Sequence, residues 1–453
     1  MTEQRIGAGK RVVVVGGVAG GMSAAAKAKR VDPELEVTVY EKSNYISYGA
    51  CGMPYVIGGD IGSLDDLLAR TPAAMAEKGV VVHVRHEVMG VDPDAGTVAV
   101  KNLETGDLHT APYDALVLAT GAVPVRPELP GIGLEGVHVL RIIEDAAAIQ
   151  ETIRGGAKEA LIIGGSYIGL ELAEALVKAG LRVRVVEQQG SLLANFGPLP
   201  SKLALEEVEK NGVTVQLKTE VTALGGDTRV REGVTDAGRF PADLVVVAVG
   251  ARPNNALAES LGLDLGPAGA VLTDDRLRTS REGIYAVGDV TAVHHLVTGE
   301  SAWLPLGDTA NKQGRTLGAL LGGKDARFKG VVGTAITKVF GRAFATTGLT
   351  LGAARDAGFD AESADIEASD HAGYYPDKRP LNVTLVWERA SRRLLGGQIV
   401  GYGDAVKRID VLAALLFQRG TLQDLADLDL AYAPPFSGVW DPLLVAANVA
   451  LGR

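Results

Sequence analysis

The chain has 453 residues, enough for roughly three domains of about 150 residues each. Its formal net charge of -10 argues against a nucleic-acid-binding protein, which needs a basic surface. Its single cysteine, Cys51, excludes both an intrachain disulfide and a thiolate-rich metal site.

Cysteine usage and apolar patterning also indicate where the protein works. A chain with one cysteine suits a reducing cytosol. The first ten residues are polar and lack the apolar segment of a secretion signal. Apolar runs such as 244–249 are far shorter than the ~20 residues that span a bilayer. We therefore expect a cytoplasmic protein with neither a membrane nor a nucleic-acid partner.

The chain opens with a strand–turn–helix–strand pattern that returns later. Residues 11–15 predict a strand, which leads through Gly16-Gly17 into a helix over 22–30 and a strand over 37–40. The same order recurs as a strand over 160–163, the turn Gly164-Gly165, a helix over 168–178 and a strand over 182–186. Two such βαβ units predict two Rossmann-like domains on parallel sheets.

The remaining elements complete an α/β fold of three parts. Buried strands are predicted over 115–119 and 244–249. Beyond about residue 327 the pattern changes to strands over 331–340, 381–387 and 393–400, an amphipathic helix over 404–418 and a rigid, non-helical segment over 431–437. We expect two dinucleotide-binding domains, 11–153 with 251–326 and 154–250, followed by a C-terminal α+β domain, 327–453.

The first glycine turn has the features of a dinucleotide site. Gly16 permits the tight turn, Gly21 permits close packing of helix on strand, and the helix N-terminus offers free amides to a pyrophosphate. Val18 replaces the middle glycine of the usual pattern. Glu41 ends the second strand, where a carboxylate accepts hydrogen bonds from ribose hydroxyls.

The second turn, Gly164 to Gly169, carries Ser166 in the middle position and is followed by Glu187 at the end of its second strand. A carboxylate there repels a 2′-phosphate, so NADH is favoured over NADPH; a solvated strand-end acid is the alternative for Glu187. Two dinucleotides in one chain suggest that nicotinamide passes hydride to a flavin, which can hand electrons to sulfur.

The lone cysteine lies in the segment Gly49-Ala-Cys51-Gly-Met-Pro54. Pro54 suits the first turn of a helix and places Cys51 near a helix N-terminus. The positive end of a helix dipole lowers the pKa of a thiol and favours the thiolate. An inert structural cysteine is the alternative.

Several segments together resemble a known family. They include VVVVGGVAGGMSAAAKAKR, YISYGACGMPY, IIGGSYIGLE, GIYAVGDV, HAGYYP and AYAPPFS. From about Arg11 onward the chain resembles the single-cysteine class of FAD-dependent pyridine nucleotide-disulfide oxidoreductases, and within it the coenzyme A-disulfide reductases. The resemblance implies FAD and NAD(P)H as cofactors and a C-terminal dimerisation domain that forms a homodimer.

The resemblance also assigns cofactor contacts residue by residue. Those implied for FAD are Gly16, Gly17, Gly21, Glu41, Lys42, Val88, Thr120, Gly121, Asp289 and Gly307. Those implied for the nicotinamide dinucleotide are Gly164, Gly165, Ser166, Tyr167, Ile168, Glu171, Glu187 and Gly250, with Tyr167 and Glu171 near the reactive ring.

Substrate contacts follow from the same resemblance. Coenzyme A would meet Ser23, Lys27, Arg30 and Ser47. Lys27 and Arg30 suit its phosphates, although a solvated helix face is the alternative for both. In the homodimer, active sites are shared: Tyr374 or Tyr375, together with Tyr432, would reach the substrate sulfur bound to the other subunit.

The implied activity is the reduction of coenzyme A disulfide by NAD(P)H through FAD and Cys51, with coenzyme A as substrate or as a mixed disulfide on Cys51. Ala19 replaces the histidine of the peroxidase and oxidase branch, and Ala50 stands where the family often has asparagine. The alternatives are an NADH oxidase or peroxidase that uses a sulfenic acid, a persulfide or polysulfide reductase, and an NADH- and FAD-binding regulator.

The histidines predict no metal site. His83 and His86 lie in strand-like sequence, where positions three apart point to opposite faces.

Overall fold

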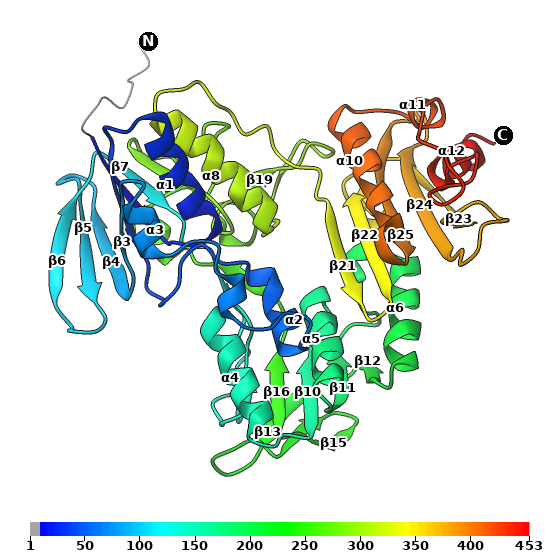
Figure 1. Cartoon of the computed structure of the whole chain (residues 1–453), viewed down its shortest axis with the longest axis horizontal. Helices are drawn as coiled ribbons and strands as arrows, with labels where there is room; N and C mark the ends of the chain where they lie inside the picture. The colour runs from blue at the N-terminus through cyan, green and yellow to red at the C-terminus, as the bar shows by residue number, and fades with distance from the viewer. Residues whose placement is uncertain (1–9, 453) are drawn as a thin grey trace.

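The computed structural model describes residues 10–452 (Figure 1), so the prediction that residues 1–9 contain no secretion signal lies outside it. Within that range the α/β class is confirmed, with two parallel sheets followed by an antiparallel one.

The predicted strand over 11–15 is the central strand of the first parallel sheet, whose order is β18-β7-β1-β2-β3. Alternate valines of this strand enter opposite cores, because both faces are covered. Val12 and Val14 pack under α1 and α8, and Val13 and Val15 pack toward the small antiparallel sheet β4-β5-β6. The bounds are β1 Arg11–Val15, α1 Ala19–Val31, β2 Glu36–Tyr40, β3 Val80–His83, β4 His86–Asp92, β5 Thr97–Asn102, β6 Leu108–Pro112, β7 Ala115–Leu118, β18 Ile284–Ala286 and α8 Gly307–Leu321.

The second parallel sheet repeats this plan in the order β12-β11-β10-β16-β9. The predicted strands at 160–163, 182–186 and 244–249 are its β10, β11 and β16, and the helix predicted over 168–178 is α5. The bounds are β9 Val137–His138, α4 Ile143–Arg154, β10 Glu159–Ile163, α5 Tyr167–Lys178, β11 Arg182–Glu187, α6 Pro198–Lys210, β12 Thr214–Leu217, β13 Val221–Gly225, β14 Glu232–Thr235, β15 Gly238–Pro241 and β16 Leu244–Val247.

Short elements lie in the connections outside these two sheets. The antiparallel pair β8 and β17 ties the two crossover segments together. The bounds are α2 Met53–Ile57, α3 Pro72–Ala76, β8 Ala122–Pro124, β17 Ala251–Pro253, α7 Ala256–Ser260, β19 Val293–His294 and β20 Ser301–Ala302.

The C-terminal sheet is antiparallel, in the order β21-β22-β25-β24-β23, and its core is shared with α10 and α12. Figure 1 shows it on the opposite side of the molecule from the first sheet. The bounds are β21 Ala335–Val339, β22 Arg342–Gly348, α9 Leu351–Asp356, β23 Ala361–Ser369, β24 Pro380–Glu388, β25 Leu394–Gly401, α10 Ile409–Phe417, α11 Leu422–Ala426 and α12 Pro442–Leu451. Residues 431–437 are non-helical, as predicted.

Two expectations differ from the structure. The helix predicted over 404–418 begins as a 3-10 turn over Gly403–Arg408, and only Ile409–Phe417 is α-helical. At the junction the Arg408 guanidinium donates to the carbonyls of Ala405 and Phe436, which fixes the tighter turn.

The prediction that His83 and His86 point to opposite faces is wrong. A turn at residues 84–85 separates β3 from β4, so the two histidines belong to different strands. Their ring centroids lie 5.2 Å apart, and both rings contact Tyr40. Over residues 10–452, no group of three or more His, Cys, Asp or Glu side chains is arranged to hold a metal ion.

None of the helices that the structure describes is long and apolar enough to cross a bilayer.

Candidate active site

The two glycine turns have the same local geometry. Gly16 and Gly164 have φ values of +105° and +108°, a region that side chains rarely adopt. A Cβ on Gly16 would lie 2.2 Å from the Ala119 carbonyl oxygen, and one on Gly164 would lie 2.5 Å from that of Ala248. Both positions therefore require glycine, because each turn passes directly over a neighbouring strand end.

The acids at the ends of β2 and β11, Glu41 and Glu187, make the same contacts with their glycine turns. The Gly17 amide donates to Glu41 Oε2 at 2.7 Å, and the Gly165 amide donates to Glu187 Oε2 at 2.6 Å. The second oxygen of each carboxylate accepts from the amide two residues further on, at Ser43 and at Gln189. Each acid thus fixes the path of its own glycine turn.

Further predicted cofactor positions surround these turns. The Thr120 hydroxyl donates to the Asn254 carbonyl at 2.6 Å, and the Asn254 amide donates to the Gly121 carbonyl at 2.9 Å. A Cβ placed on Gly250 or Gly307 would meet no atom of the described residues within 4 Å. The open space at these two glycines, together with the two glycine turns, fits a pair of dinucleotides. Val88 is buried beside a bulge in β4, and Lys42 is exposed.

Asp289 has a partner that no sequence motif indicated. Arg141 Nη2 lies 2.6 Å from Asp289 Oδ2, and this ion pair joins the segment before α4 to the loop after β18. The Trp303 indole donates to the Asp289 carbonyl at 2.8 Å. Arg141 stands alone in a segment without a recognisable pattern, so only the fold could find it.

Cys51 occupies a single 3-10 turn, Ala50–Gly52, immediately before α2. Pro54 lies in the first turn of α2, as predicted. The turn is closed by a 2.9 Å hydrogen bond from the Gly52 amide to the Gly49 carbonyl. Cys51 is exposed and is the one free cysteine of the chain.

The expected lowering of the Cys51 pKa is wrong for the chain by itself. Neighbouring protein atoms partly desolvate the thiol, and the carboxylates of Glu171 and Asp289 add to this, so the pKa of Cys51 is raised from its ordinary value. Arg141 acts in the opposite direction.

Tyr167, Ile168 and Glu171 lie on the first turn and a half of α5. Tyr167 and Ile168 are exposed at its start, which is capped by the Ser166 side chain. Glu171 is part-buried, and Thr337 of β21 donates a 2.7 Å hydrogen bond to its Oε1. Burial raises the pKa of Glu171 to about 7. The Thr337 contact was not predicted, because nothing in the sequence links the two segments.

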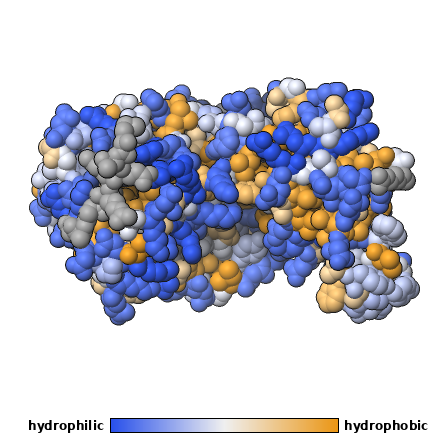
Figure 2. All heavy atoms as spheres, turned by 90° about the horizontal axis from the view of Figure 1, so that it is seen from above, coloured by the Kyte–Doolittle hydropathy of each residue, from blue (hydrophilic) through white to orange (hydrophobic). Residues whose placement is uncertain are grey.

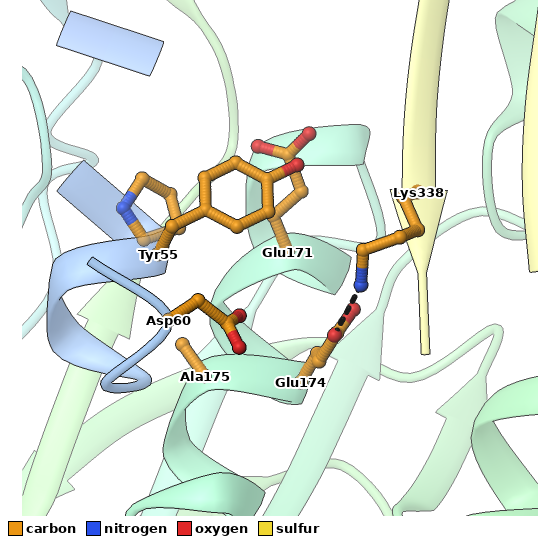
Figure 3. Close-up of a pocket in the computed structure, with 7 residues that line it drawn as sticks. Tyr55, Asp60, Glu171, Glu174, Ala175 and Lys338 are labelled. Carbon is orange, nitrogen blue, oxygen red and sulfur yellow. Dashed lines mark hydrogen bonds and ion pairs between the residues drawn. The ribbon is translucent and has the colours of Figure 1, made fainter. Parts of the chain in front are cut away.

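Figure 3 shows a small pocket where α2, α5 and β21 meet. Glu171 and Glu174 project into it from α5, and Tyr55 faces them from α2. Lys338 of β21 forms an ion pair with Glu174. The lining residues of the pocket that Figure 3 labels are Tyr55, Asp60, Glu171, Glu174, Ala175 and Lys338.

The predicted coenzyme A contacts lie on α1 and just after β2. The Ser23 hydroxyl donates to Asn311 Oδ1 of α8 at 2.7 Å, so it is already engaged within the chain. Lys27 is part-exposed and Arg30 is fully on the surface. Ser47 has a φ of +50°, and its amide donates to the Gly17 carbonyl at 2.9 Å. Ser47 thereby links the segment before Cys51 to the first glycine turn.

The predicted tyrosines lie on the C-terminal domain. The hydroxyls of Tyr374 and Tyr432 are 3.3 Å apart, and both side chains are exposed. Tyr375 instead stacks on His371, with ring centroids 5.8 Å apart, and His371 Nδ1 contacts Asp370 at 2.7 Å. The structure therefore pairs Tyr374, not Tyr375, with Tyr432.

Apolar surface gathers over the C-terminal domain on the face seen in Figure 2. The exposed large apolar side chains of this domain include Phe417, Phe436, Val439, Trp440 and Val449. A monomer rarely exposes so many in one region, so this surface fits a protein–protein contact.

Comparisons with known proteins agree with this geometry. A family model described as pyridine nucleotide-disulphide oxidoreductase matches residues 10–314, and the dimerisation-domain model of the same family matches residues 334–443. The chain is 40% identical over 442 residues to the NAD(P)H coenzyme A polysulfide/persulfide reductase of Pyrococcus horikoshii, which covers 97% of this chain and 98% of that protein. It is 30% identical over 433 residues to coenzyme A disulfide reductase of Staphylococcus aureus, covering 94% and 96%.

A solved structure, a NAD-dependent persulfide reductase from A. fulgidus, superposes with a TM-score of 0.95 at 39% identity. The match covers 98% of this chain and 83% of that one.

Proposed function

The chain belongs to the pyridine nucleotide-disulphide oxidoreductase family, and from that premise we propose that it uses NADH and FAD to reduce a sulfur–sulfur bond of a coenzyme A-linked substrate through Cys51. The observation that carries the proposal is the position of Cys51. It is exposed in a tight turn and lies close enough to Glu171 of α5 for that carboxylate to shift the pKa of the thiol.

The two βαβ units divide the cofactors between them in this proposal. Residues 11–153 and 251–326 hold FAD through the Gly16 turn, with Glu41 at the ribose. Residues 154–250 hold NADH through the Gly164 turn, with Glu187 at the ribose. A bound flavin accepts hydride from nicotinamide and supplies two electrons to sulfur. The remaining contacts are those of the family resemblance.

Cys51 then acts by thiol–disulfide exchange. Its thiolate attacks one sulfur of coenzyme A disulfide, the S–S bond breaks, and one coenzyme A thiolate leaves while the other stays on Cys51 as a mixed disulfide. Two electrons supplied by the flavin would then break the S–S bond of the mixed disulfide, so that the second coenzyme A leaves as a thiolate and Cys51 returns to its thiolate. The two coenzyme A thiolates take up one proton each. One cysteine suffices because the substrate brings the second sulfur.

A persulfide or polysulfide of coenzyme A is the second candidate substrate. Relatives at 39% and 40% identity carry persulfide or polysulfide reductase in their names, whereas the relative at 30% is named for coenzyme A disulfide. Both substrates present a sulfur–sulfur bond to the same thiolate, so the proposed role of Cys51 is the same.

We also propose that the protein works as a homodimer with shared active sites. The dimerisation-domain match and the exposed apolar surface of the same domain support the association. In the dimer, the Tyr374–Tyr432 pair of one subunit would face Cys51 of the other and orient or protonate the leaving thiolate.

The test combines two measurements on the purified protein. NADH consumption is measured with coenzyme A disulfide, coenzyme A persulfide, inorganic polysulfide, hydrogen peroxide and oxygen. The native mass is measured before and after reduction. We expect turnover with a coenzyme A-linked acceptor at least tenfold above the oxygen background, and a mass increment of one coenzyme A that reduction removes.

Three other outcomes would overturn the proposal. Peroxide or oxygen as the best acceptor would indicate an oxidase or peroxidase. Inorganic polysulfide reduced without any dependence on coenzyme A would remove coenzyme A from the substrate class. No turnover with any acceptor would indicate a regulatory NADH- and FAD-binding protein.

A further inference from the structure

The reaction proposed above needs a proton from solvent. When NADH reduces a disulfide, the two sulfurs receive two electrons and two protons, and hydride carries both electrons but only one of the protons. One proton per turnover must therefore enter from water. The same holds for a persulfide acceptor, so a proton-exchanging group near Cys51 is required whichever sulfur substrate is used.

Glu171 lies where such a group is needed. Its helix, α5, packs against α2, the helix that follows directly after Cys51. Tyr55 of α2 faces Glu171 across the pocket (Figure 3), and the Glu171 carboxylate makes the largest charge contribution to the Cys51 thiol.

Some of the side chains that line the pocket beside Glu171 are partly exposed to solvent. At its rim the Asp60 and Lys338 side chains are 45% and 43% exposed, whereas Glu174 is buried on its inner side. Glu174 is held by three partners, Lys178, Lys338 and the Phe340 amide. Glu171 has only the Thr337 hydroxyl as a hydrogen-bond partner among the described residues. One carboxylate of the pocket is locked, and the other is free to exchange a proton.

Thr337 comes from a different domain from the acid that it holds. It is buried on β21, the edge strand of the C-terminal sheet, and its neighbour Lys338 anchors Glu174 one turn further along α5. Two consecutive residues of β21 thus contact two acids of the same helix: Thr337 donates a hydrogen bond to Glu171, and Lys338 forms an ion pair with Glu174. The C-terminal domain fixes where Glu171 points.

We propose that Glu171 exchanges the proton of the reaction between Cys51 and solvent through this pocket, and that Thr337 is its positioning residue. This inference rests on the proposed sulfur–sulfur reduction. The charged and titratable groups around Glu171 are Cys51 before α2, Tyr55 and Asp60 from α2 and its following loop, Tyr167 and Glu174 from α5, and Lys338 from β21.

The direction of the pH effect follows from these partners. Glu171 must carry its proton to donate it, so turnover should fall as pH rises through its pKa of about 7. The Thr337 hydroxyl donates to the charged carboxylate and lowers that pKa. Removing the hydroxyl should therefore move the fall in turnover to higher pH.

The experiment compares four variants of the FAD-loaded protein. Thr337→Val should shift the alkaline limb of the turnover profile upward by about half a pH unit or more, and Thr337→Ser, which keeps a hydroxyl, should restore the original profile. Glu171→Gln should remove the fall in turnover at alkaline pH and should lower turnover at every pH. Thr347→Val is the matched control: it removes a buried hydroxyl from neighbouring β22, whose partner is Thr334 at 2.7 Å and not Glu171.

A second readout does not depend on turnover. The pH dependence of Cys51 alkylation is measured in the reduced protein. Because charged Glu171 raises the Cys51 pKa, Glu171→Gln should move the alkylation curve to lower pH. The inference is overturned if Thr337→Val shifts the turnover profile no more than Thr347→Val does, or if Glu171→Gln leaves both curves in place. A failure of the proposed function itself would appear separately, as undiminished acceptor turnover in a Cys51→Ser variant.

Discussion

Glu187 accepts a 2.6 Å hydrogen bond from the amide of Gly165, so the acid that ends β11 also fixes the glycine turn opposite it. In the proposed NADH site this carboxylate holds the ribose and repels a 2′-phosphate. Glu187→Ala should raise the KM for NADH about tenfold, since a hydrogen bond to a charged group contributes ~1.5–3 kcal/mol.

The same variant should narrow the preference for NADH over NADPH, measured as the ratio of the two kcat/KM values. Glu41→Ala is the matched control, because Glu41 makes the equivalent contact with Gly17 in the first turn. It should weaken flavin retention and leave that ratio unchanged. An unchanged ratio in Glu187→Ala would contradict the assignment of the second turn to NADH.

Cys51→Ser separates the two halves of the proposed reaction. Flavin reduction by NADH should persist, because Cys51 is not needed for hydride transfer. Turnover with coenzyme A disulfide should fall at least a hundredfold, because serine cannot form a mixed disulfide. Stopped-flow absorbance of the flavin and steady-state NADH consumption provide the two measurements.

Arg141 should tune the thiol through its charge. It lies 2.6 Å from Asp289 and is the cation that lowers the Cys51 pKa. Arg141→Gln should raise that pKa further, so that alkylation of the reduced protein at pH 8 becomes severalfold slower, because less of Cys51 is then thiolate. Arg154→Gln, on the exposed face of α4, serves as the control and should alkylate at the wild-type rate.

Glu171 should make stability depend on pH. Its folded-state pKa of about 7 lies above the ordinary value of 4.5, so folding disfavours the charged form. The destabilisation is absent below pH 4.5, develops as pH rises, and is complete above pH 7. Glu171→Gln lacks this destabilisation. Its free energy of unfolding, compared with that of the wild type, should therefore rise by about 3 kcal/mol when the pH is changed from 4.5 to 8.

Chemical denaturation at the two pH values measures this difference. Glu206→Gln, an exposed glutamate on α6, should show no comparable gain. A Glu171→Gln variant whose advantage is equal at both pH values would contradict the raised pKa.

The tyrosine pair gives a prediction that distinguishes neighbours. Tyr374→Phe removes a hydroxyl that lies 3.3 Å from that of Tyr432 and should lower turnover with the sulfur acceptor about a hundredfold. Tyr375→Phe is the matched control, because Tyr375 stacks on His371 instead, and its turnover should stay near wild type. The double variant Tyr374→Phe with Tyr432→Phe should lower turnover little more than either single change does, because the two hydroxyls act together.

The local sequence pattern predicted the strands and turns of the parallel sheets correctly, but it predicted the helices of the C-terminal domain less well. The valines of β1 and the glycine turn after it predict strand and turn directly, because both depend on neighbours in sequence. The α-helix predicted from residue 404 begins at Ile409, because the residues before it form a 3-10 turn in which Arg408 donates to the Phe436 carbonyl. His83 and His86 were misplaced because the turn between them has no glycine or proline.

The sequence by itself determined the α/β class, the two glycine turns with their strand-end acids, and Cys51 as the one available thiol, because each depends on spacing along a short segment. Only the tertiary structure decided that Thr337 holds Glu171, that Arg141 pairs with Asp289, and that Tyr374 rather than Tyr375 meets Tyr432. It also reversed the expected shift of the Cys51 pKa. These contacts and charges join residues far apart in the chain, so no local pattern records them.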